Sequence, residues 1–193
     1  MPRVKLFDEE EVLEKAMKLF WKQGFYATSM QDLVNELGIN RASIYDTYGD
    51  KKKLFLKAFS LYRKTSRTML KTFLYSHSSV KKGFLELFLL AVDDGIEDKE
   101  RKGCFVVNST TELASEDEII FEIIKENKQV FEELFYDHLK LGVTRGEIDE
   151  NKDIRAIASF LFIFNNGLKV MLKAGSSREE LKSTVNLALS ILD

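Results

Sequence analysis

Apolar and polar residues recur with a helical period along most of the chain, and the pattern is most informative in residues 28–51. The first helix predicted there carries apolar residues at the i, i+3, i+4, i+7 spacing of a buried stripe: Met30, Leu33, Val34 and Leu37. A turn at Gly38 follows, and Asn40, a residue type that caps helix N-termini, opens a second, shorter helix. That helix directs Ile44 and Tyr48 to the same interior.

The outward face of the second helix has no core in which to bury its side chains. Its residues are small, polar or aromatic: Arg41, Ala42, Ser43, Tyr45, Asp46 and Thr47. Two helices joined by a tight turn, the second exposing hydrogen-bonding groups, are typical of a helix-turn-helix whose second helix enters a DNA major groove. The alternative is a helical ligand- or partner-binding protein that has lost DNA binding.

The pattern predicts helices on both sides of this motif. Residues 8–11 are an acidic capping start for a supporting helix that ends at Gly24, and Thr28-x-x-Gln31 has the form of a capping box for the next helix. Lys51 begins a long helix that runs to about Tyr75. A lysine in the first turn opposes the helix macrodipole unless an anion lies there, so we expect Lys51 to contact a DNA phosphate.

Further helices are predicted over residues 80–96, 115–142, 152–173 and 177–192, with capping boxes at Ser115-x-x-Glu118 and Ser177-x-x-Glu180. Residues 104–113 fit a short helix or turn, although the residues around Val107 fit a strand equally well on local propensity. The charged residues 93–103 are interpreted as a surface connection.

The only proline is at position 2, which favours an all-α chain. We predict an N-terminal three-helix helix-turn-helix DNA-binding domain over residues 1–50. A C-terminal helical-bundle domain over residues 51–193 would bind a ligand and dimerise, with the long helix from Lys51 connecting the two.

The charge is unevenly distributed, and only the N-terminal third suits a polyanion. Residues 1–67 carry 13 Lys and Arg against 9 Asp and Glu, and residues 68–193 carry 16 against 22, which together give the net charge of −2. The longest apolar run, residues 157–164, is shorter than the ~20 residues of a membrane span. With no apolar leader after the first residues and a single cysteine, the sequence predicts a cytoplasmic protein.

The helix predicted over residues 153–172 is apolar on nearly every face and must therefore be covered on two sides. One side can face its own core. The other most simply faces a second copy of the chain, together with Val185, Leu189 and Leu192 of the last helix, in a four-helix homodimer interface. A single thick core is the alternative.

No catalytic constellation or cofactor-binding motif is found, so we expect neither an enzyme nor a cofactor. His77 and His138 lack metal-ligand spacing to each other or to Cys104, and no metal is expected. Cys104 is interpreted first as a small buried hydrophobe. The competing hypothesis is a redox or electrophile sensor, because Arg101 and Lys102 lie close in sequence and favour a thiolate.

The C-terminal region is rich in phenylalanine, which is core more often than pocket, but a cavity between helices with a few polar groups is where all-α proteins bind small molecules. The candidate pocket residues are Phe84, Phe88, Cys104, Phe105, Asn108, Phe121, Phe131, Phe160, Phe164 and Asn165.

The segments AMKLFWKQG and GFYATSMQDLVNELGINRASIYDTYGDKKKLF closely resemble the tetracycline-repressor (TetR/AcrR) family of bacterial transcriptional regulators over about residues 8–56. The segment GCFVVNSTTEL is similar to one found in part of the family. This chain has Tyr48 where most members have Phe, Thr47 where many have His, and Ala42 where many have Gly, which puts the operator sequence in doubt.

The resemblance implies a homodimeric DNA-binding regulator, most simply a repressor, that a small-molecule effector releases from a double-stranded DNA operator. Some members sense electrophiles through a cysteine. Carried over by position, Thr28, Tyr45 and Lys51 would contact phosphates, and Arg41, Ser43 and Thr47 would face base edges. The full set of expected DNA-binding residues is Thr28, Ser29, Asn40, Arg41, Ala42, Ser43, Tyr45, Thr47, Tyr48 and Lys51.

Overall fold

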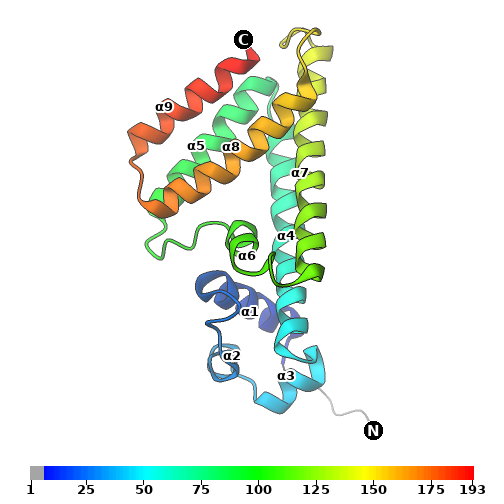
Figure 1. Cartoon of the computed structure of the whole chain (residues 1–193), viewed down its shortest axis with the longest axis vertical. Helices are drawn as coiled ribbons and strands as arrows, with labels where there is room; N and C mark the ends of the chain where they lie inside the picture. The colour runs from blue at the N-terminus through cyan, green and yellow to red at the C-terminus, as the bar shows by residue number, and fades with distance from the viewer. Residues whose placement is uncertain (1–6) are drawn as a thin grey trace.

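A computed structural model describes residues 7–193, and the described chain is built from helices without strands (Figure 1). The elements are α1 (Glu9–Gln23), α2 (Met30–Leu37), α3 (Arg41–Tyr48), α4 (Lys51–Tyr75), α5 (Val80–Glu97), α6 (Phe105–Leu113), α7 (Glu118–Thr144), α8 (Ile154–Ala174), α9 (Arg178–Leu189) and a short 3-10 helix, Ser190–Leu192. The all-α prediction is confirmed. The first helices form the lower end of the molecule in Figure 1, and α5, α8 and α9 form the upper end.

Two of the predicted N-caps are wrong by one or two residues. Ser29, not Thr28, caps α2, and it forms a capping box with Asp32. Asp117, not Ser115, caps α7 by accepting the backbone N–H groups of Ile119 and Ile120. In both places two overlapping candidates carried suitable side chains, and the sequence pattern selected the earlier one.

Other predicted ends of helices are confirmed. Asp8 accepts the backbone N–H of Glu10 at 2.8 Å and so caps α1. Ser177 caps α9. Gly38 ends α2 with φ of +68°, a left-handed conformation that glycine adopts without strain.

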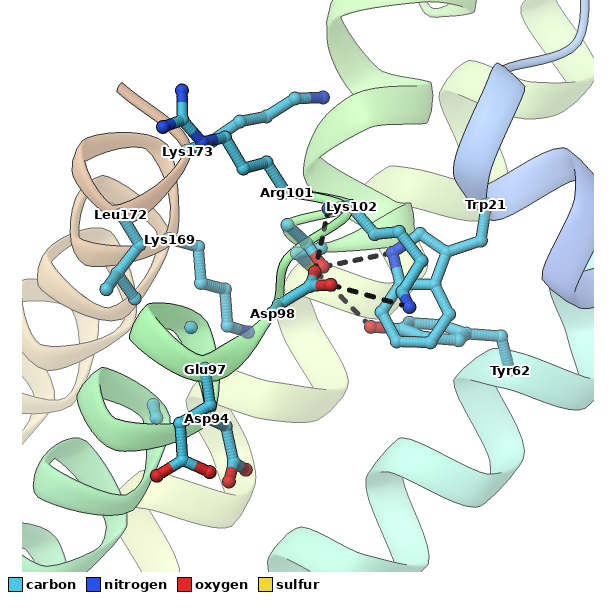
Figure 2. Close-up of a pocket in the computed structure, with 14 residues that line it drawn as sticks. Trp21, Tyr62, Asp94, Glu97, Asp98, Arg101, Lys102, Lys169, Leu172 and Lys173 are labelled. Carbon is cyan, nitrogen blue, oxygen red and sulfur yellow. Dashed lines mark hydrogen bonds and ion pairs between the residues drawn. The ribbon is translucent and has the colours of Figure 1, made fainter. Parts of the chain in front are cut away.

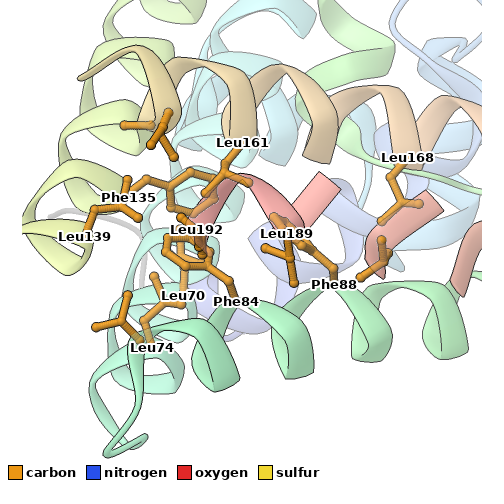
Figure 3. Packing of buried hydrophobic residues seen from close by; sticks show 14 of the residues in the cluster. Leu70, Leu74, Phe84, Phe88, Phe135, Leu139, Leu161, Leu168, Leu189 and Leu192 are labelled. Atoms are coloured by element: carbon orange, nitrogen blue, oxygen red, sulfur yellow. The ribbon is translucent and has the colours of Figure 1, made fainter. Parts of the chain in front are cut away.

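The buried side chains form two clusters. The first joins α1, α2, α3 and the first half of α4 to α6 and the start of α7, with Phe20, Phe55 and Phe105 fully buried in it. The second lies between the second half of α4 and α5, α7, α8 and α9 (Figure 3). α4 contributes side chains to both clusters and so joins them.

α6 settles the ambiguity that the sequence left at residues 104–113, and the strand alternative is wrong. The helix begins after Cys104, whose carbonyl accepts the N–H of Asn108 at 2.9 Å. Phe105 and Leu113 are both buried in the N-terminal cluster, and eight residues span about 12 Å in a helix against about 26 Å in a strand, so the helix keeps both side chains within one cluster. Tertiary packing therefore overrides the strand propensity of its valines.

α8 buries one face and exposes the other. Six of its residues are buried: Ile157, Ala158, Leu161, Asn165, Leu168 and Leu172. The outer face carries Phe160, Ile163, Val170 and Met171, and α9 beside it exposes Leu187 at 75%. By length and composition alone α8 could cross a membrane, which is weak evidence because core helices of soluble proteins pass the same test.

Candidate nucleic-acid interface and effector pocket

α3 is held by its inner face, which leaves its outer face free. Ile44 is fully buried, and Tyr48 is buried and donates its hydroxyl to the Glu9 carbonyl at 2.9 Å. Burial raises the pKa of Tyr48 to about 12, so this donor stays protonated. At the other end, Asn40 Oδ1 accepts the backbone N–H of Ser43 at 2.8 Å. A cap and two buried anchors thus fix a helix of only eight residues.

The outer face of α3 presents the side chains expected from the sequence. Arg41, Ala42 and Tyr45 are exposed, and Ser43 and Thr47 are half-buried. The Arg41 Nη2 donates to Tyr45 Oη at 3.3 Å, and its guanidinium carbon lies 5.7 Å from the ring centroid. The two side chains therefore support each other while both remain at the surface, as a contact to a nucleic acid requires.

Of the three consecutive lysines at residues 51–53, Lys51 is the one that forms no ion pair with a carboxylate of the described residues. Lys52 pairs with Asp117 at 2.5 Å and Lys53 lies 3.9 Å from Asp50. Among residues 7–193, Lys51 has no ion pair, and its Nζ lies 4.5 Å from the centroid of the Phe25 ring. Partial burial lowers the pKa of Lys51. The ammonium is therefore positioned at the start of α4 and remains available to an external anion.

Two expected DNA-contacting side chains do not reach the surface. Thr28 is fully buried and donates its hydroxyl to the Gly24 carbonyl at 2.6 Å. Tyr48 is 4% exposed and engaged with Glu9, as described above. Their side chains position the motif instead of touching a ligand. Ser29, by contrast, is exposed at the N-terminus of α2, where its hydroxyl donates to Asp32 at 2.6 Å.

The contacts that join the motif to α6 leave no pattern in the sequence. The Glu112 carboxylate accepts the backbone N–H groups of Phe25 and Tyr26 at 3.1 and 2.8 Å, across more than 80 residues of chain. The Tyr26 hydroxyl donates to Glu116 at 2.5 Å. α6 thus holds the segment that enters α2, directly beside Phe25 and the Lys51 ammonium above it.

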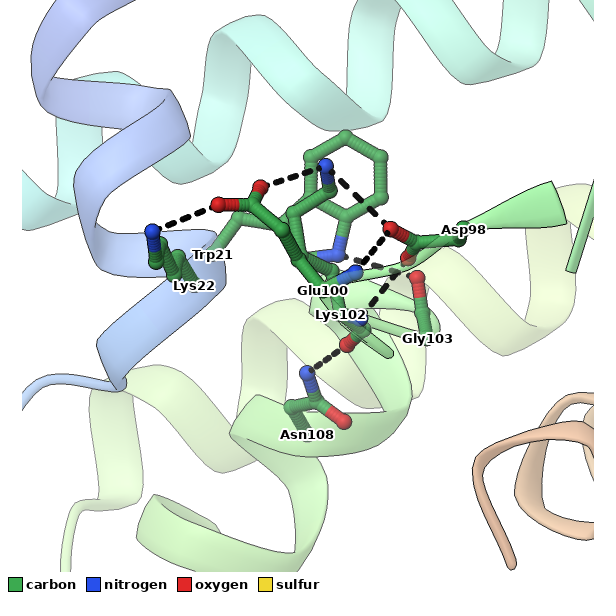
Figure 4. Close-up of polar contacts among 7 residues, drawn as sticks. All are labelled: Trp21, Lys22, Asp98, Glu100, Lys102, Gly103 and Asn108. Carbon is green, nitrogen blue, oxygen red and sulfur yellow. Dashed lines mark hydrogen bonds and ion pairs between the residues drawn. The ribbon is translucent and has the colours of Figure 1, made fainter. Parts of the chain in front are cut away.

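A second set of contacts joins α1 to the loop before α6 (Figure 4). The Trp21 indole donates to the Gly103 carbonyl at 2.9 Å, and Lys22 pairs with Glu100 at 2.5 Å. Glu100 also accepts from Lys102 at 3.0 Å. Both ends of the segment 98–113 are therefore attached to the DNA-binding motif.

The same loop forms one wall of a pocket of about 550 Å³ between α1, α4, α5 and α8 (Figure 2). Trp21 and Tyr62 lie on one side, and Lys169, Leu172 and Lys173 of α8 lie on the other. A second pocket of about 340 Å³ adjoins it between α6 and α8. Cys104 and Lys169 line both, so α6 begins at the point where the two pockets meet.

The predicted pocket residues are divided by the structure. Cys104 and Asn108 line the pockets, and Phe131 and Asn165 line a smaller cavity behind Cys104. Phe84, Phe88 and Phe105 are fully buried core residues, while Phe121 and Phe160 are exposed at the surface. Phe164 packs on Phe88 with ring centroids 5.3 Å apart. Phe84, Phe88, Phe105 and Phe164 therefore belong to the core, and one wall of the larger pocket comes from the charged loop interpreted as a surface connection.

Comparison with known proteins agrees with this architecture. The model of the "Bacterial regulatory proteins, tetR family" matches residues 12–58, and that of the "Tetracyclin repressor-like, C-terminal domain" matches residues 84–187. The chain belongs to the TetR family. The match covers both the helix-turn-helix motif and the helical bundle.

Relatives and solved structures of the TetR family align over nearly the full chain. The HTH-type transcriptional regulator YezE of Bacillus subtilis is 34% identical over 100% of both chains. The HTH-type transcriptional repressor ComR of Escherichia coli is 28% identical over 98% of this chain and 90% of its own. A cysteine variant of the TetR family regulator CifR, complexed with 26-bp double-strand operator DNA, has a TM-score of 0.88 at 26% identity, covering 99% of this chain and 100% of its own.

This TetR-family chain is thus a transcriptional regulator by homology, and its relatives are regulators, not enzymes. Within residues 7–193, no group of three or more His, Cys, Asp or Glu side chains is placed to hold a metal ion. The pocket therefore offers its chemistry through side chains alone.

Cys104 is 6% exposed, as its interpretation as a buried residue predicts, but its surroundings are polar. The Tyr62 hydroxyl lies 3.8 Å from its Sγ. Burial acts to raise the pKa of the Cys104 thiol, but the Lys169 ammonium, the backbone N–H of Val107 and the Tyr62 hydroxyl together hold it below its usual value. The cation beside it is thus Lys169 of α8, not the sequence neighbours Arg101 and Lys102.

Proposed function

We propose that the protein is a cytoplasmic homodimeric repressor that occupies a DNA operator and leaves it when a small molecule binds the C-terminal domain. The outer face of α3 carries this proposal, because exposed Arg41 and Tyr45 stand on a short helix anchored by buried Ile44 and Tyr48. The operator complex of the CifR variant, which aligns over nearly the whole chain, supports it.

We assign separate roles to the side chains of the outer face. Arg41, Ser43 and Thr47 face base edges, where arginine reads guanine through two hydrogen bonds. Tyr45 and Lys51 contact phosphates on the two sides of the groove. The hydroxyl of Ser29 and the backbone N–H groups at the start of α2 form a further phosphate seat.

The dimer rests on the unpartnered apolar face of α8 and α9. Ile163 is 65% exposed and Leu187 is 75% exposed, and both lie on long helices whose other faces pack in the core. A second copy would cover this face in a four-helix arrangement. The dimer is needed for specific binding, because one two-turn helix contacts only a few base pairs. Two recognition helices about 34–36 Å apart double the number of base pairs that are contacted.

α6 is the physical link between effector and operator in this proposal. Its first turn, at Cys104 and Asn108, lines the pockets, and Glu112 near its end holds the backbone of Phe25 and Tyr26. An effector that displaces the start of α6 pulls on the segment entering α2. The boundary near residue 50 separates the two domains in function, although the first core cluster continues from α4 into α6.

The experiment that tests the proposal is a selection of bound genomic fragments followed by fluorescence anisotropy on the selected duplex. A repressor that occupies an operator should bind the selected duplex sequence-specifically, with an affinity that falls steeply as the salt concentration rises. Equal binding to the selected and a random duplex, or no binding at all, would contradict the proposal.

A covalent effector is a second candidate, favoured by the lowered pKa of Cys104 at the meeting point of the pockets. An electrophile that reacts with this thiol would enlarge the side chain at the N-cap of α6. The regulator would then release DNA without a reversible ligand. Loss of electrophile response in Cys104→Ser, with operator binding retained, is the expected result.

A further inference from the structure

A small cavity of about 30 Å³ lies between α4, α6, α7 and α8, behind Cys104; we name it the inner chamber. Polar or charged residues form much of its wall, among them Tyr62, Arg63, Cys104, Asn127, Asn165 and Lys169, with Ser66 and Asn166 beside them. Three of these, Tyr62, Cys104 and Lys169, also line the 550 Å³ pocket, so the chamber is the inner end of that pocket. Such a concentration of polar groups in the interior of an apolar bundle requires an explanation.

Asn165 is the first sign that the chamber is built for a ligand. It is 7% exposed, it lies on the buried face of α8 between Leu161 and Leu168, and it lines the chamber. Its amide makes no hydrogen bond to any residue in the range 7–193. Because this amide lines the cavity, its donor and its acceptor are available to a group that enters there.

Asn127 adds a second amide from the opposite helix. It is 6% exposed, and its Oδ1 accepts from the Arg63 Nε at 3.2 Å. The Asn127 NH₂ group, a donor, makes no hydrogen bond among the described residues. Asn127 of α7 and Asn165 of α8 thus line the same small space, which Asn166 of α8 lines as well.

The charges around the chamber are positive. No Asp or Glu lines it among the described residues. Arg63 is compensated by Glu126 at 2.7 Å, a carboxylate that is 65% exposed and lies outside the chamber. Lys169 has no carboxylate within ion-pair distance in residues 7–193. One cation therefore remains uncompensated beside two asparagine amides and the Tyr62 hydroxyl.

We propose that the inner chamber receives the carboxylate of an organic-acid effector, with Lys169 supplying the charge and Asn165 and Asn127 the amide N–H donors. This inference rests on the proposed function and names the chemical class of its effector. The organic part of the molecule extends into the 550 Å³ pocket between Trp21 and Leu172.

The size of the chamber favours a carboxylate over a larger anion. A volume of 30 Å³ holds about two water-sized groups, which matches the two oxygens of a carboxylate. A phosphate or sulfonate has three terminal oxygens in a tetrahedral array and needs more room. Charge-assisted hydrogen bonds from a low-dielectric wall are also the stronger kind, so a neutral amide of the same shape binds less well.

The chamber also explains how such a ligand acts on DNA binding. Tyr62 and Arg63 belong to α4, which begins at Lys51, and Cys104 begins α6, which ends near Glu112. A carboxylate drawn toward Lys169 displaces side chains of both helices. Both helices reach the DNA-binding motif, α4 through Lys51 and α6 through the contacts of Glu112.

The test uses isothermal titration calorimetry of the full chain with matched probes: straight-chain carboxylates from acetate to octanoate and benzoate, each compared with its primary amide. We expect at least one carboxylate to bind about tenfold or more tightly than its amide. Lys169→Gln should weaken that carboxylate about tenfold and leave the amide unchanged. Asn165→Leu, of similar size, should weaken it as well.

Two control variants distinguish the effect of the Lys169 charge in the chamber from the effect of removing a lysine elsewhere. Lys182→Gln, on α9 and in the wall of neither the larger pocket nor the chamber, should bind as the wild type does. Lys71→Gln, an exposed lysine of α4 that lines neither space, should also retain carboxylate binding. If Asn165→Leu fails to fold, Lys169→Gln still decides, because Lys169 is half-exposed.

The proposal is overturned if no carboxylate in the series is preferred over its amide, or if the preference survives in Lys169→Gln. Operator binding without ligand is measured on the same samples. A chain that binds its operator but shows no carboxylate preference refutes the inference and leaves the proposed function standing. A chain that binds no DNA refutes the proposed function.

Discussion

Removing the Glu112 carboxylate should uncouple α6 from the DNA-binding motif. In Glu112→Ala the backbone N–H groups of Phe25 and Tyr26 lose their shared acceptor. A hydrogen bond to a charged group contributes about 1.5–3 kcal/mol, and the more exposed N–H of Tyr26 regains water, so we expect a loss of about 2–3 kcal/mol in the free energy of unfolding. Glu112→Gln keeps a neutral acceptor and should lose about 1 kcal/mol.

Urea unfolding followed by circular dichroism measures this loss, and fluorescence anisotropy measures the accompanying fall in operator affinity. The matched control is Glu116→Ala. This variant also removes a carboxylate that contacts Tyr26, but only its surface hydroxyl, so its unfolding midpoint should change little. Equal midpoints and equal operator affinities for the Glu112→Ala and Glu116→Ala variants would refute the assignment of α6 as the link.

Three further predictions concern the dimer, the thiol and pH. Ile163→Glu should produce monomers in sedimentation velocity and lose operator affinity, whereas Met69→Glu, equally exposed on α4, should remain dimeric. Cys104→Ser should abolish DNA release by electrophiles, and unchanged release would exclude the thiol as sensor. His138 is buried, both its ring nitrogens lack a hydrogen-bond partner in residues 7–193, and burial lowers its pKa from 6.5 to about 4. Its neutral form stabilises the fold above pH 6.5, and this contribution falls by about 2 kcal/mol at pH 5, because the unfolded chain binds the proton more readily. Urea midpoints of His138→Leu should therefore fall less than those of the wild type between pH 7 and pH 5.

The helices were predictable because their periodicity and caps are local. Ile44 and Tyr48 are buried as their spacing requires, and Gly38 ends α2 as a left-handed residue. The first residue of a helix was harder to predict where two residues that can cap a helix lie close together in the sequence. At Thr28 and Ser29 only the packing of the Thr28 hydroxyl against Gly24 decides between the two.

The pocket was less predictable because it is formed by contacts between residues far apart in the sequence. Phe84 and Phe105 were assigned to it from their composition, but both are core residues. One of its walls is formed instead by charged residues of the segment 94–103, which only the fold brings beside α1 and α8. Contacts such as Trp21 with Gly103 span about eighty residues of chain and leave no periodic signal.

Operator binding through the outer face of α3 and through Lys51 is tested most directly by its dependence on salt concentration. The logarithm of the association constant should fall linearly with the logarithm of salt concentration. Lys51→Ala should reduce that slope by about 1 and weaken all duplexes alike, whereas Arg41→Ala should cost about 1–3 kcal/mol and relax specificity.

Lys71→Ala, an exposed lysine farther along α4, is the control and should keep the wild-type slope. We expect the salt slope of operator binding to be equal for the wild type and Lys71→Ala and shallower for Lys51→Ala. Of these proteins, only Arg41→Ala should lose its preference for the operator sequence. A wild-type slope near zero, or variants of Lys51 and Arg41 that bind the selected operator as the wild type does, would contradict this expectation.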